Sequence, residues 1–225
     1  MRLPAKDRRE QLIDVAMRLF SVQGFDGTTT REIAEAAGVN EAIIFRHFSS
    51  KEELYWAVVN ARMGTSGRRR KIEKALEANL SERDTLAAIA CSLLERTPQD
   101  FALTRLLLFT GLRNAELSEL FFRNYISETF ELLSDYFRKG MSAGRFRNVD
   151  PVVAARGFLG MITNHNLVQE LFGGNRYQQF DPQVLGDKMA DLFLNGLSAA
   201  AAIESQSGAV NENGIERFAA SQATE

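Results

Sequence analysis

Residues 29–51 read TTREIAEAAGVNEAIIFRHFSSK. Two short runs with apolar residues at helical spacing flank Gly38, a residue suited to the left-handed backbone of a tight turn. Thr29 or Thr30 stands where the first helix would be capped, and Asn40 stands where the second would be. The stretch therefore predicts two short helices joined by a tight turn, which is the arrangement of a helix-turn-helix.

The second of these helices has apolar residues on both of its sides. A helix beginning at Glu41 would place Ile44 and Phe48 on one face and turn Ala42 and Ile43 away from it. A helix in the major groove of DNA would explain the outward pair, because thymine presents a methyl group there that small or apolar side chains contact. The pattern alone is also typical of structural helical bundles, so it does not decide between the two interpretations.

Composition sets broad limits on the protein class. The chain has 225 residues, 45% of them hydrophobic and 25% charged, as in an ordinary globular protein. The formal net charge of -2 means that binding to nucleic acid would depend on where the positive charges lie. One cysteine, Cys91, excludes an intramolecular disulfide, and its apolar helical surroundings predict a buried thiol. No stretch resembles a signal peptide or a membrane span, so we expect a cytoplasmic protein without a membrane partner.

Helical spacing of apolar residues continues along nearly the whole chain and predicts an all-α fold. The first helix is expected to end at Gly24. A longer fourth helix should follow the helix-turn-helix, with Ser49 or Ser50 as its cap. Gly64 and Gly67 lie inside that helix, where glycine destabilises helical backbone, and they predict a bend or break.

Beyond the bend we expect helices at about 82–96, 99–112, 114–140, 150–172 and 181–203, for a total of about nine. Asp150 as cap and Pro151 at the first helical position mark the start of the fourth of these. The predicted division of the chain is an N-terminal domain of three helices at residues 6–66, linked by the long fourth helix to a C-terminal helical bundle at 67–204, and a disordered tail at 205–225.

Residues 8–59 carry several linked motifs in a fixed order. They are A-x-x-L-F (Ala16, Leu19, Phe20), G-F followed by T-T (Gly24, Phe25, Thr29, Thr30), I-A-x-x-A-G-V (Ile33 to Val39), F-x-x-F (Phe45, Phe48) and S-K-x-x-L (Ser50, Lys51, Leu54). With these motifs the segment resembles the N-terminal DNA-binding domain of the TetR family of transcriptional regulators. The resemblance covers about a quarter of the chain.

The resemblance implies a homodimer in which two helix-turn-helix domains read a palindromic operator on double-stranded DNA. It further implies that a C-terminal helical domain supplies the dimer interface and a pocket for a small, largely apolar effector whose binding releases DNA. Most members are repressors. The residues onto which it carries DNA contacts are Thr30, Arg31, Asn40, Glu41, Ala42, Ile43, Phe45, Arg46, His47 and Lys51.

The chemistry of three of these residues agrees with that role. Arg31, Arg46 and Lys51 can contact phosphate, and an arginine can also contact a guanine edge. The sequence departs from the family at three other positions: Phe45 stands where the family most often has tyrosine, Ile43 where it often has threonine or serine, and Glu41 where it frequently has lysine or glutamine. Each departure removes a hydroxyl or a positive group that could contact DNA.

Large apolar and aromatic side chains in the C-terminal half supply more volume than a slim bundle needs. They suit either a thick core or an apolar cavity, and the resemblance favours a cavity. The candidate ligand-binding residues are Arg105, Phe109, Thr110, Arg113, Phe130, Phe158, Met161, Asn164 and His165. Asn164 and His165 have a second interpretation, in which they lie at a dimer interface or face water.

Small and apolar residues in the last two predicted helices would let helices of two protomers approach closely. The candidate dimer residues are Ala154, Gly157, Gly160, Leu192, Phe193, Gly196 and Leu197. The alternative is a monomer that buries these faces internally.

Other functional classes find little support. No catalytic or phosphate-binding motif is present, and the two histidines, His47 and His165, lie in different predicted domains, so we expect no catalytic site, metal or cofactor. The first alternative to a repressor is a ligand- or partner-binding α-helical bundle in which the helix-turn-helix is only scaffold. The second is an all-α enzyme, which lacks a recognisable nucleophile and base.

Overall fold

The computed structural model describes residues 4–66 and 68–197, and these are almost entirely helical. No β-strand occurs within these two ranges, and the all-α prediction is confirmed. The helices in chain order are α1 (Ala5–Gln23), α2 (Thr30–Ala36), α3 (Glu41–His47), α4 (Lys51–Ser66), α5 (Arg68–Glu77), α6 (Glu82–Leu94), α7 (Pro98–Arg113), α8 (Ala115–Phe121), the π-helical η1 (Phe122–Ile126), α9 (Ser127–Ser142), α10 (Pro151–Glu170), the 3-10 turn η2 (Gly174–Arg176) and α11 (Pro182–Leu197).

The predicted helix ends agree with the structure to within a few residues, but one helix is divided more finely than expected. Residue 67, between α4 and α5, lies outside the described residues, so the bend predicted near Gly64 and Gly67 stays a prediction. The helix predicted at 114–140 contains η1, where the Ser127 N–H donates to the Phe122 carbonyl five residues earlier. Such a π turn inserts an extra residue into the helix. The predicted tail at 205–225 and the end of the helix predicted to reach 203 lie outside the described residues.

Side-chain caps fix the starts of α2, α3 and α4 in the first domain. Thr29 caps α2 in a capping box with Glu32, and Asn40 caps α3 by accepting from the Ala42 N–H at 2.9 Å. The Ser50 hydroxyl accepts from the Glu53 N–H at 3.1 Å in the first turn of α4. These caps satisfy backbone N–H groups that have no partner inside their own helix.

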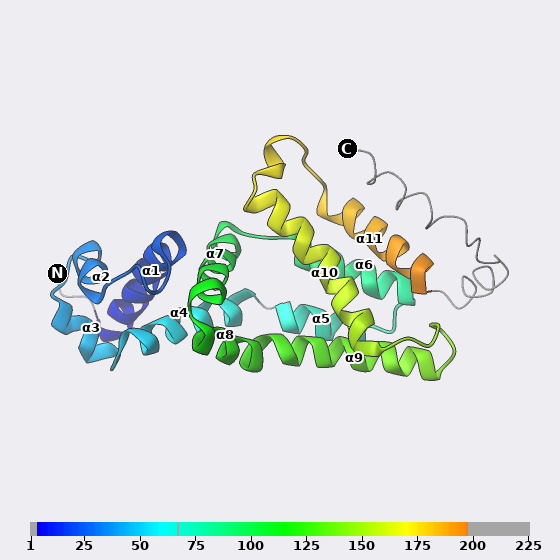
Figure 1. The fold of residues 1–225 in the computed structure, drawn as a ribbon, viewed down its shortest axis with the longest axis horizontal. Helices are drawn as coiled ribbons and strands as arrows, with labels where there is room; N and C mark the ends of the chain where they lie inside the picture. Colours follow the sequence, from blue (N-terminus) through cyan, green and yellow to red (C-terminus); the bar gives the residue numbers. More distant parts are fainter. Residues whose placement is uncertain (1–3, 67, 198–225) are drawn as a thin grey trace, which may run out of the picture.

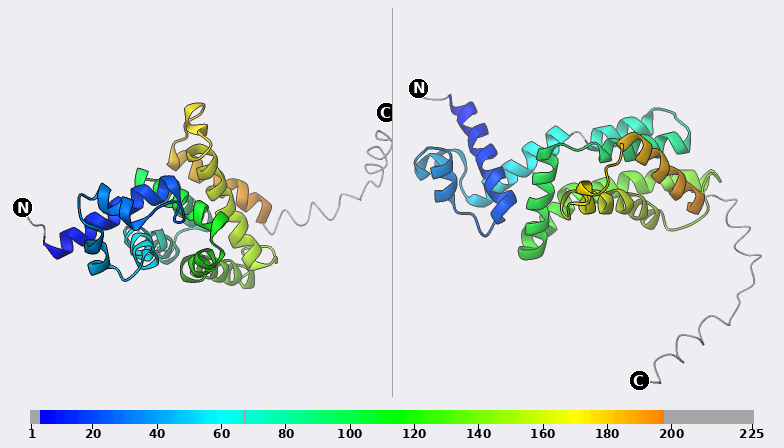
Figure 2. Two further views of the ribbon diagram at one scale, coloured as in Figure 1. Left: turned by 60° about the vertical axis from the view of Figure 1, so that its left-hand side comes forward. Right: turned by 90° about the horizontal axis from the view of Figure 1, so that it is seen from above.

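The molecule is elongated, with α1, α2 and α3 at one end (Figure 1). Helix α7 stands between this end and the C-terminal helices, and α8, η1 and α9 form one long rod along the lower edge of the view. Helices α6, α10 and α11 lie at the other end, where α11 packs along α6 and α10 packs on α9. The views in Figure 2 show the same order along the long axis.

Two hydrophobic cores lie along this axis. The first core joins α1 to α4 and also contains Leu103 and Leu106 of α7 and Leu117 of α8. The second core is built from α5, α6, α9, α10 and α11, with Phe137 and Phe158 among its fully buried side chains. The division of the chain at residue 66 stays a prediction, but the first core extends well beyond it in sequence. The helix-turn-helix therefore shares its core with two helices of the C-terminal half.

Tyr55 of α4 is the main link inside this first core. Its side chain is fully buried, and its hydroxyl donates to Thr110 Oγ1 of α7 at 3.2 Å. We call this pairing the interdomain contact. The Tyr55 ring also packs edge-on against Phe25 and Trp56, at centroid distances of 5.3 and 5.1 Å. Burial raises the pKa of the Tyr55 hydroxyl, which therefore stays a neutral donor at physiological pH.

A mostly buried ion pair holds α7 to α10. Arg96 Nε lies 2.7 Å from Glu170 Oε1, with only 7% and 20% of the two side chains exposed. Arg96 Nη2 also donates to the Asp100 carbonyl and to Thr104 Oγ1 at the start of α7. Breaking a buried pair from one side leaves an uncompensated charge, which is far more destabilising than losing an exposed pair.

We predict that Arg96→Met lowers the free energy of unfolding by about 3–5 kcal/mol, because Glu170 would keep its buried charge without a partner. The matched control is Arg123→Met, which removes the exposed ion pair with Glu119 and should change stability by less than about 0.5 kcal/mol. Urea denaturation of the two variants measures both values. Equal, small losses for the two variants would contradict the assignment of Arg96 as a structural link.

Candidate nucleic-acid interface

Helix α3 presents two faces of different character. Ile44 is fully buried in the first core, and Phe48 follows it there. Ala42, Phe45 and Arg46 are exposed on the opposite side and form what we call the outer face of α3. Ile43 and His47 are half-buried at its edges. The capped start of α3 and the buried pair on its inner side fix the direction in which the outer face points.

Phe45 is the large apolar side chain of the outer face. It is 51% exposed, so the first core does not account for its presence. Ala42 adds a small apolar side chain one turn earlier. An exposed aromatic ring beside a methyl group is suited to apolar contact with the methyl groups and sugar edges of a DNA groove.

Arg46 is the cation of the outer face. Within the described part of the chain its guanidinium makes no hydrogen bond or ion pair, and it is exposed. Arg31 at the start of α2 is also exposed, but its Nε lies 3.0 Å from Glu35 Oε1 in a pair four residues apart. Exposed pairs of this kind contribute little, so Arg31 can exchange Glu35 for a phosphate at small cost. Arg46 needs no such exchange.

The ammonium group of Lys51 is already bound within the protein. Its Nζ donates to the Phe25 carbonyl at 3.0 Å and to the Thr28 carbonyl at 3.1 Å, and it lies 4.2 Å from the centre of the Phe25 ring. The ammonium group therefore holds the turn between α1 and α2 from inside. A phosphate contact by Lys51, as the family resemblance implies, stays a prediction, and it would compete with these three interactions.

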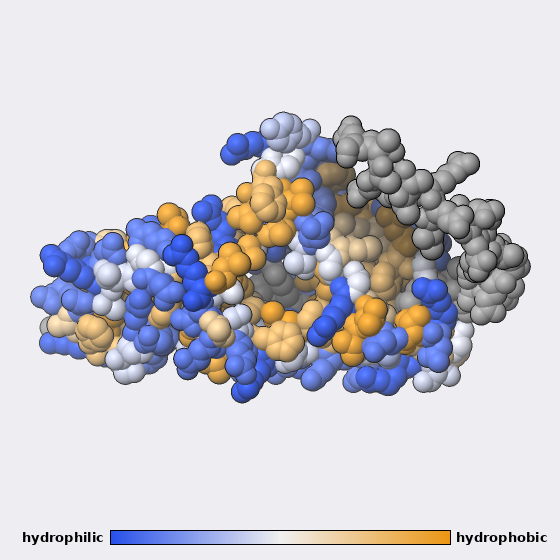
Figure 3. All heavy atoms as spheres, viewed as in Figure 1, coloured by the Kyte–Doolittle hydropathy of each residue, from blue (hydrophilic) through white to orange (hydrophobic). Residues whose placement is uncertain are grey.

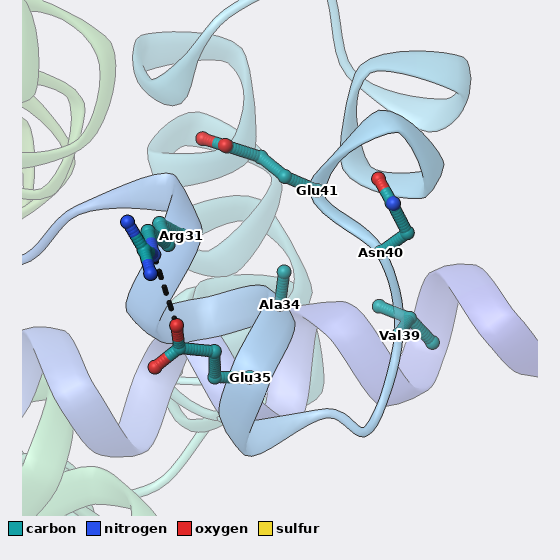
Figure 4. A pocket seen from close by; sticks show the side chains of 6 residues that line it. All are labelled: Arg31, Ala34, Glu35, Val39, Asn40 and Glu41. Carbon is teal, nitrogen blue, oxygen red and sulfur yellow. Dashed lines mark hydrogen bonds and ion pairs between the residues drawn. The ribbon is translucent and has the colours of Figure 1, made fainter.

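Thr30 and Glu41, two further DNA-contact candidates, contact one another. The Thr30 hydroxyl donates to Glu41 Oε1 at 2.5 Å and connects the first turn of α2 to the first turn of α3. A shallow pocket lies between these helices, lined by Arg31, Ala34, Glu35, Val39, Asn40 and Glu41 (Figure 4). The view shows the Glu41 side chain reaching from α3 towards the start of α2.

The structure therefore places the predicted DNA-contact residues on α2, on α3 with its cap, and, for Lys51, at the start of α4, all at one end of the molecule. Asn40 caps α3 with its side-chain oxygen, which places its backbone at the start of the outer face. The arrangement can insert α3 into a groove about as wide as a helix while α2 lies across the sugar-phosphate backbone.

Two family models match the chain. The model for bacterial regulatory proteins of the tetR family matches residues 12–58, and the model for the C-terminal domain of AefR-like transcriptional repressors matches residues 84–195. The chain belongs to the TetR family. It is a helix-turn-helix transcriptional regulator, as the sequence motifs predicted.

Several relatives match this TetR-family chain over most of their own length. The transcriptional repressor Rv1474c of Mycobacterium tuberculosis is 29% identical over 194 residues, covering 84% of this chain and 92% of that protein. The repressor KstR2 of Rhodococcus jostii is 30% identical over 159 residues, 68% of this chain and 74% of that protein. The solved structure of AibR with isovaleryl coenzyme A and operator DNA has a TM-score of 0.64 and 22% identity, covering 82% of this chain and 97% of that one.

The residues predicted to bind a ligand in this TetR-family chain do not form one cluster. Thr110 is buried in the interdomain contact, and Phe109 lies beside Gly24, where an added Cβ would be 3.4 Å from the Phe109 Cβ. The close approach and the positive φ of Gly24, +78°, both favour glycine there. The ring of Phe158 is fully buried in the second core, 5.2 Å from the ring centre of Phe193. These contacts give the three side chains a role in packing, and their predicted contact with a ligand stays a prediction.

The remaining candidates are spread over the surface of the C-terminal helices. Arg113 and Asn164 are exposed, Met161 is half-buried, and His165 packs edge-on against Phe180 with its pKa lowered by burial. Phe130 lies under the guanidinium of Arg156, and Arg105 lies over the ring of Phe101 with its buried Nε unpartnered among the described residues. The proposed ligand set stays untested as a whole.

The predicted dimer residues divide into two groups. Gly157, Gly160 and Gly196 are exposed, and Leu192 is 70% exposed on α11. Ala154 and Phe193 instead point into the second core. The side chain of Leu197 lies outside the described residues.

Sequence reasoning missed several residues of these surfaces. Arg9 near the start of α1 lies 4.9 Å from the centre of the Phe48 ring, beside the end of α3. Val153 and Val168 are exposed on the same side of α10 as Gly157 and Gly160, and Val184 is exposed on α11. The α10 residues are spaced by four, three and eight positions, and this helical spacing is the feature of the sequence that could have indicated a shared side. Nothing in the sequence indicates the contact of Arg9 with Phe48, because it joins residues far apart in the chain.

Over residues 4–66 and 68–197, no helix is both long and apolar enough to cross a membrane. No group of three or more possible metal ligands gathers in that same part of the chain.

The cap of α2 should make the first domain sensitive to acid. Hydrogen bonds from the Thr29 N–H and hydroxyl lower the pKa of Glu32 below its ordinary value. The stabilisation by the charged carboxylate is therefore complete above the ordinary pKa, and it is lost as the pH falls through the lower pKa of the folded state. We predict that Glu32→Gln, which cannot titrate, makes the melting temperature fall less steeply between about pH 5 and about pH 3. Fluorescence of Trp56, the one tryptophan, reports the transition. Parallel curves for wild type and variant would contradict this role.

Lys51 and Arg46 should respond in opposite ways to neutral substitution. We predict that Lys51→Gln costs about 1.5 kcal/mol of stability, because the turn loses two charged hydrogen bonds, and leaves the salt dependence of operator affinity unchanged. Arg46→Gln should leave stability unchanged and reduce the slope of log affinity against log salt by about one. Thermal unfolding and titrations at several salt concentrations measure both. A reduced slope in Lys51→Gln would show that Lys51 leaves the turn to bind phosphate.

Proposed function

We propose that this TetR-family regulator is a homodimeric repressor that binds a palindromic operator through the outer face of α3 and is released by a small, largely apolar ligand. It would act in the cytoplasm and have no enzymatic activity. The observation that carries the proposal is the outer face itself, in which an exposed aromatic ring and an arginine without an ion pair among residues 4–66 and 68–197 stand on a helix whose opposite side is buried. Single exposed apolar side chains are common on protein surfaces, so Phe45 supports the proposal through its place beside Arg46 on the outer face of α3.

The repressing role is supported by relatives, since Rv1474c and KstR2 are named transcriptional repressors. Release by a ligand is supported by AibR, whose structure contains both operator DNA and isovaleryl coenzyme A. In this chain, Figure 3 shows a hollow between α7, α10 and the rod of α8 and α9, with hydrophobic residues along part of its border and hydrophilic ones along the rest. A partly apolar opening next to α7 suits a ligand that acts on the interdomain contact.

The homodimer is supported by the unpaired apolar surface of α10 and α11. Val153, Gly157, Gly160 and Val168 form an exposed stripe along α10, and Leu192 lies exposed on α11. Glycines in such a stripe let a second helix approach closely, and two copies of the two helices would form a four-helix interface around a two-fold axis. The same axis would place two copies of α3 for the two halves of a palindrome.

A gel-shift experiment with DNA from upstream of the protein's own coding sequence tests the proposal. The wild type should retard such a fragment at low salt, and Arg46→Ala should lose specific binding while it keeps the wild-type fold and oligomeric state. If no such fragment is retarded at low salt, the helix-turn-helix is scaffold and the protein is a ligand- or partner-binding bundle.

We predict that Leu192→Asp converts the dimer into a monomer, because two buried carboxylates would face one another near the two-fold axis. The control is Leu112→Asp, which changes an equally apolar residue that is 84% exposed on α7, away from α10 and α11. Light scattering coupled to size exclusion measures the mass of each variant. A dimeric Leu192→Asp protein would place the interface elsewhere, and a monomeric wild type would mean that no dimer forms.

A further inference from the structure

The negative charge of Glu41 is unfavourable at a surface that binds DNA. Glu41 is the first residue of α3 and lies next to the outer face, at the end of the helix that would enter the groove. A carboxylate there is repelled by the surrounding phosphates, and relief requires a hydrogen-bond donor on the DNA. Either Glu41 points away from DNA, or it is placed to meet such a donor.

The structure shows how the carboxylate is oriented. The Thr30 hydroxyl donates to Glu41 Oε1 at 2.5 Å, a short distance typical of a hydrogen bond to a charged oxygen. Within the described residues Glu41 Oε2 makes no hydrogen bond or ion pair. The side chain is half-exposed, and in Figure 4 it lies above the opening between α2 and α3. One oxygen is therefore used to fix the carboxylate, and the other is available to an incoming donor.

Base edges in the major groove differ in what they offer such an oxygen. Guanine presents two acceptors, thymine an acceptor and a methyl group, and adenine one acceptor beside its amino group. Cytosine presents an amino donor without an adjacent acceptor. An ionised carboxylate can only accept hydrogen bonds, so it is attracted by cytosine and repelled by guanine and thymine.

We propose that Glu41, held by the Thr30 hydroxyl, is a specificity-determining residue that selects cytosine at one position of each operator half-site. The inference rests on the proposed function, since it requires α3 to enter the major groove. Thr30 acts as a positioning residue, because it contacts the carboxylate and orders it before DNA arrives. Preordering reduces the entropy lost on binding.

The competing interpretation is that Thr30 and Glu41 only fasten α2 to α3. Glu41→Gln separates the two roles, because the glutamine oxygen can still accept from Thr30 while its amide adds a donor. Glutamine pairs best with adenine, which offers one acceptor and one donor. The substitution should therefore keep the hydrogen bond between α2 and α3 and change the base that is preferred.

The experiment measures affinity for operator duplexes in which each half-site position is changed to all four bases, for wild type and Glu41→Gln. The wild type should prefer cytosine at one position by roughly tenfold over guanine and thymine, and Glu41→Gln should prefer adenine at that same position. Preferences at the other positions should stay unchanged, and circular dichroism should show wild-type helix content.

Thr30 supplies the matched controls. Thr30→Ser keeps the hydroxyl and should keep the cytosine preference, whereas Thr30→Val removes it and should reduce the preference several-fold without creating another. The inference is overturned if wild type shows no cytosine preference at any position, or if Glu41→Gln changes affinity equally for all sequences. Absence of any operator binding by wild type would instead overturn the proposed function, and the inference with it.

Discussion

The buried hydroxyl of Tyr55 is the interaction on which the organisation of this regulator depends. Tyr55 belongs to α4 of the helix-turn-helix domain, yet its one hydrogen bond is made to Thr110 of α7. A buried hydroxyl without a partner is unfavourable, so this bond requires α7 to stay against α4. Leu106, fully buried one turn before Thr110, extends the same attachment. The DNA-binding end is therefore built on a helix of the C-terminal half, and a movement of α7 must also move α4.

The same tyrosine connects this attachment to the DNA-facing end. Its ring packs on Phe25, and the Phe25 ring and carbonyl hold the ammonium of Lys51. Lys51 also binds the carbonyl of Thr28, directly before the cap of α2. Helix α2 in turn begins with Thr30, whose hydroxyl orients Glu41 on α3. Each contact restrains the next, so the outer face of α3 is presented by an ordered frame rather than by two independent short helices.

Features set by local sequence could be predicted, and features set by distant contacts could not. The caps at Thr29 or Thr30 and at Asn40, the turn at Gly38 and the two faces of α3 follow from helical spacing and side-chain chemistry within a few residues. The hydrogen bonds of Lys51 to the carbonyls of Phe25 and Thr28 could not be predicted, because nothing near Lys51 in sequence indicates that these groups lie within its reach. The contact of Thr110 with Tyr55 was similarly missed, since its partner is 55 residues away in the chain.

The central claim is that the helix-turn-helix and α7 form one cooperative unit, and native-state hydrogen exchange of the full chain tests it most directly. The comparison is between Leu106→Ala, which opens a cavity in the first core, and Leu86→Ala, which opens one in the second; both leucines are fully buried. We expect Leu106→Ala to speed exchange in α1, α4 and α7 together, and Leu86→Ala to speed it in α6 and α11 while α1 and α4 keep their protection. If Leu106→Ala leaves the protection of α1 and α4 unchanged, the DNA-binding domain is independent of α7 and the account is wrong.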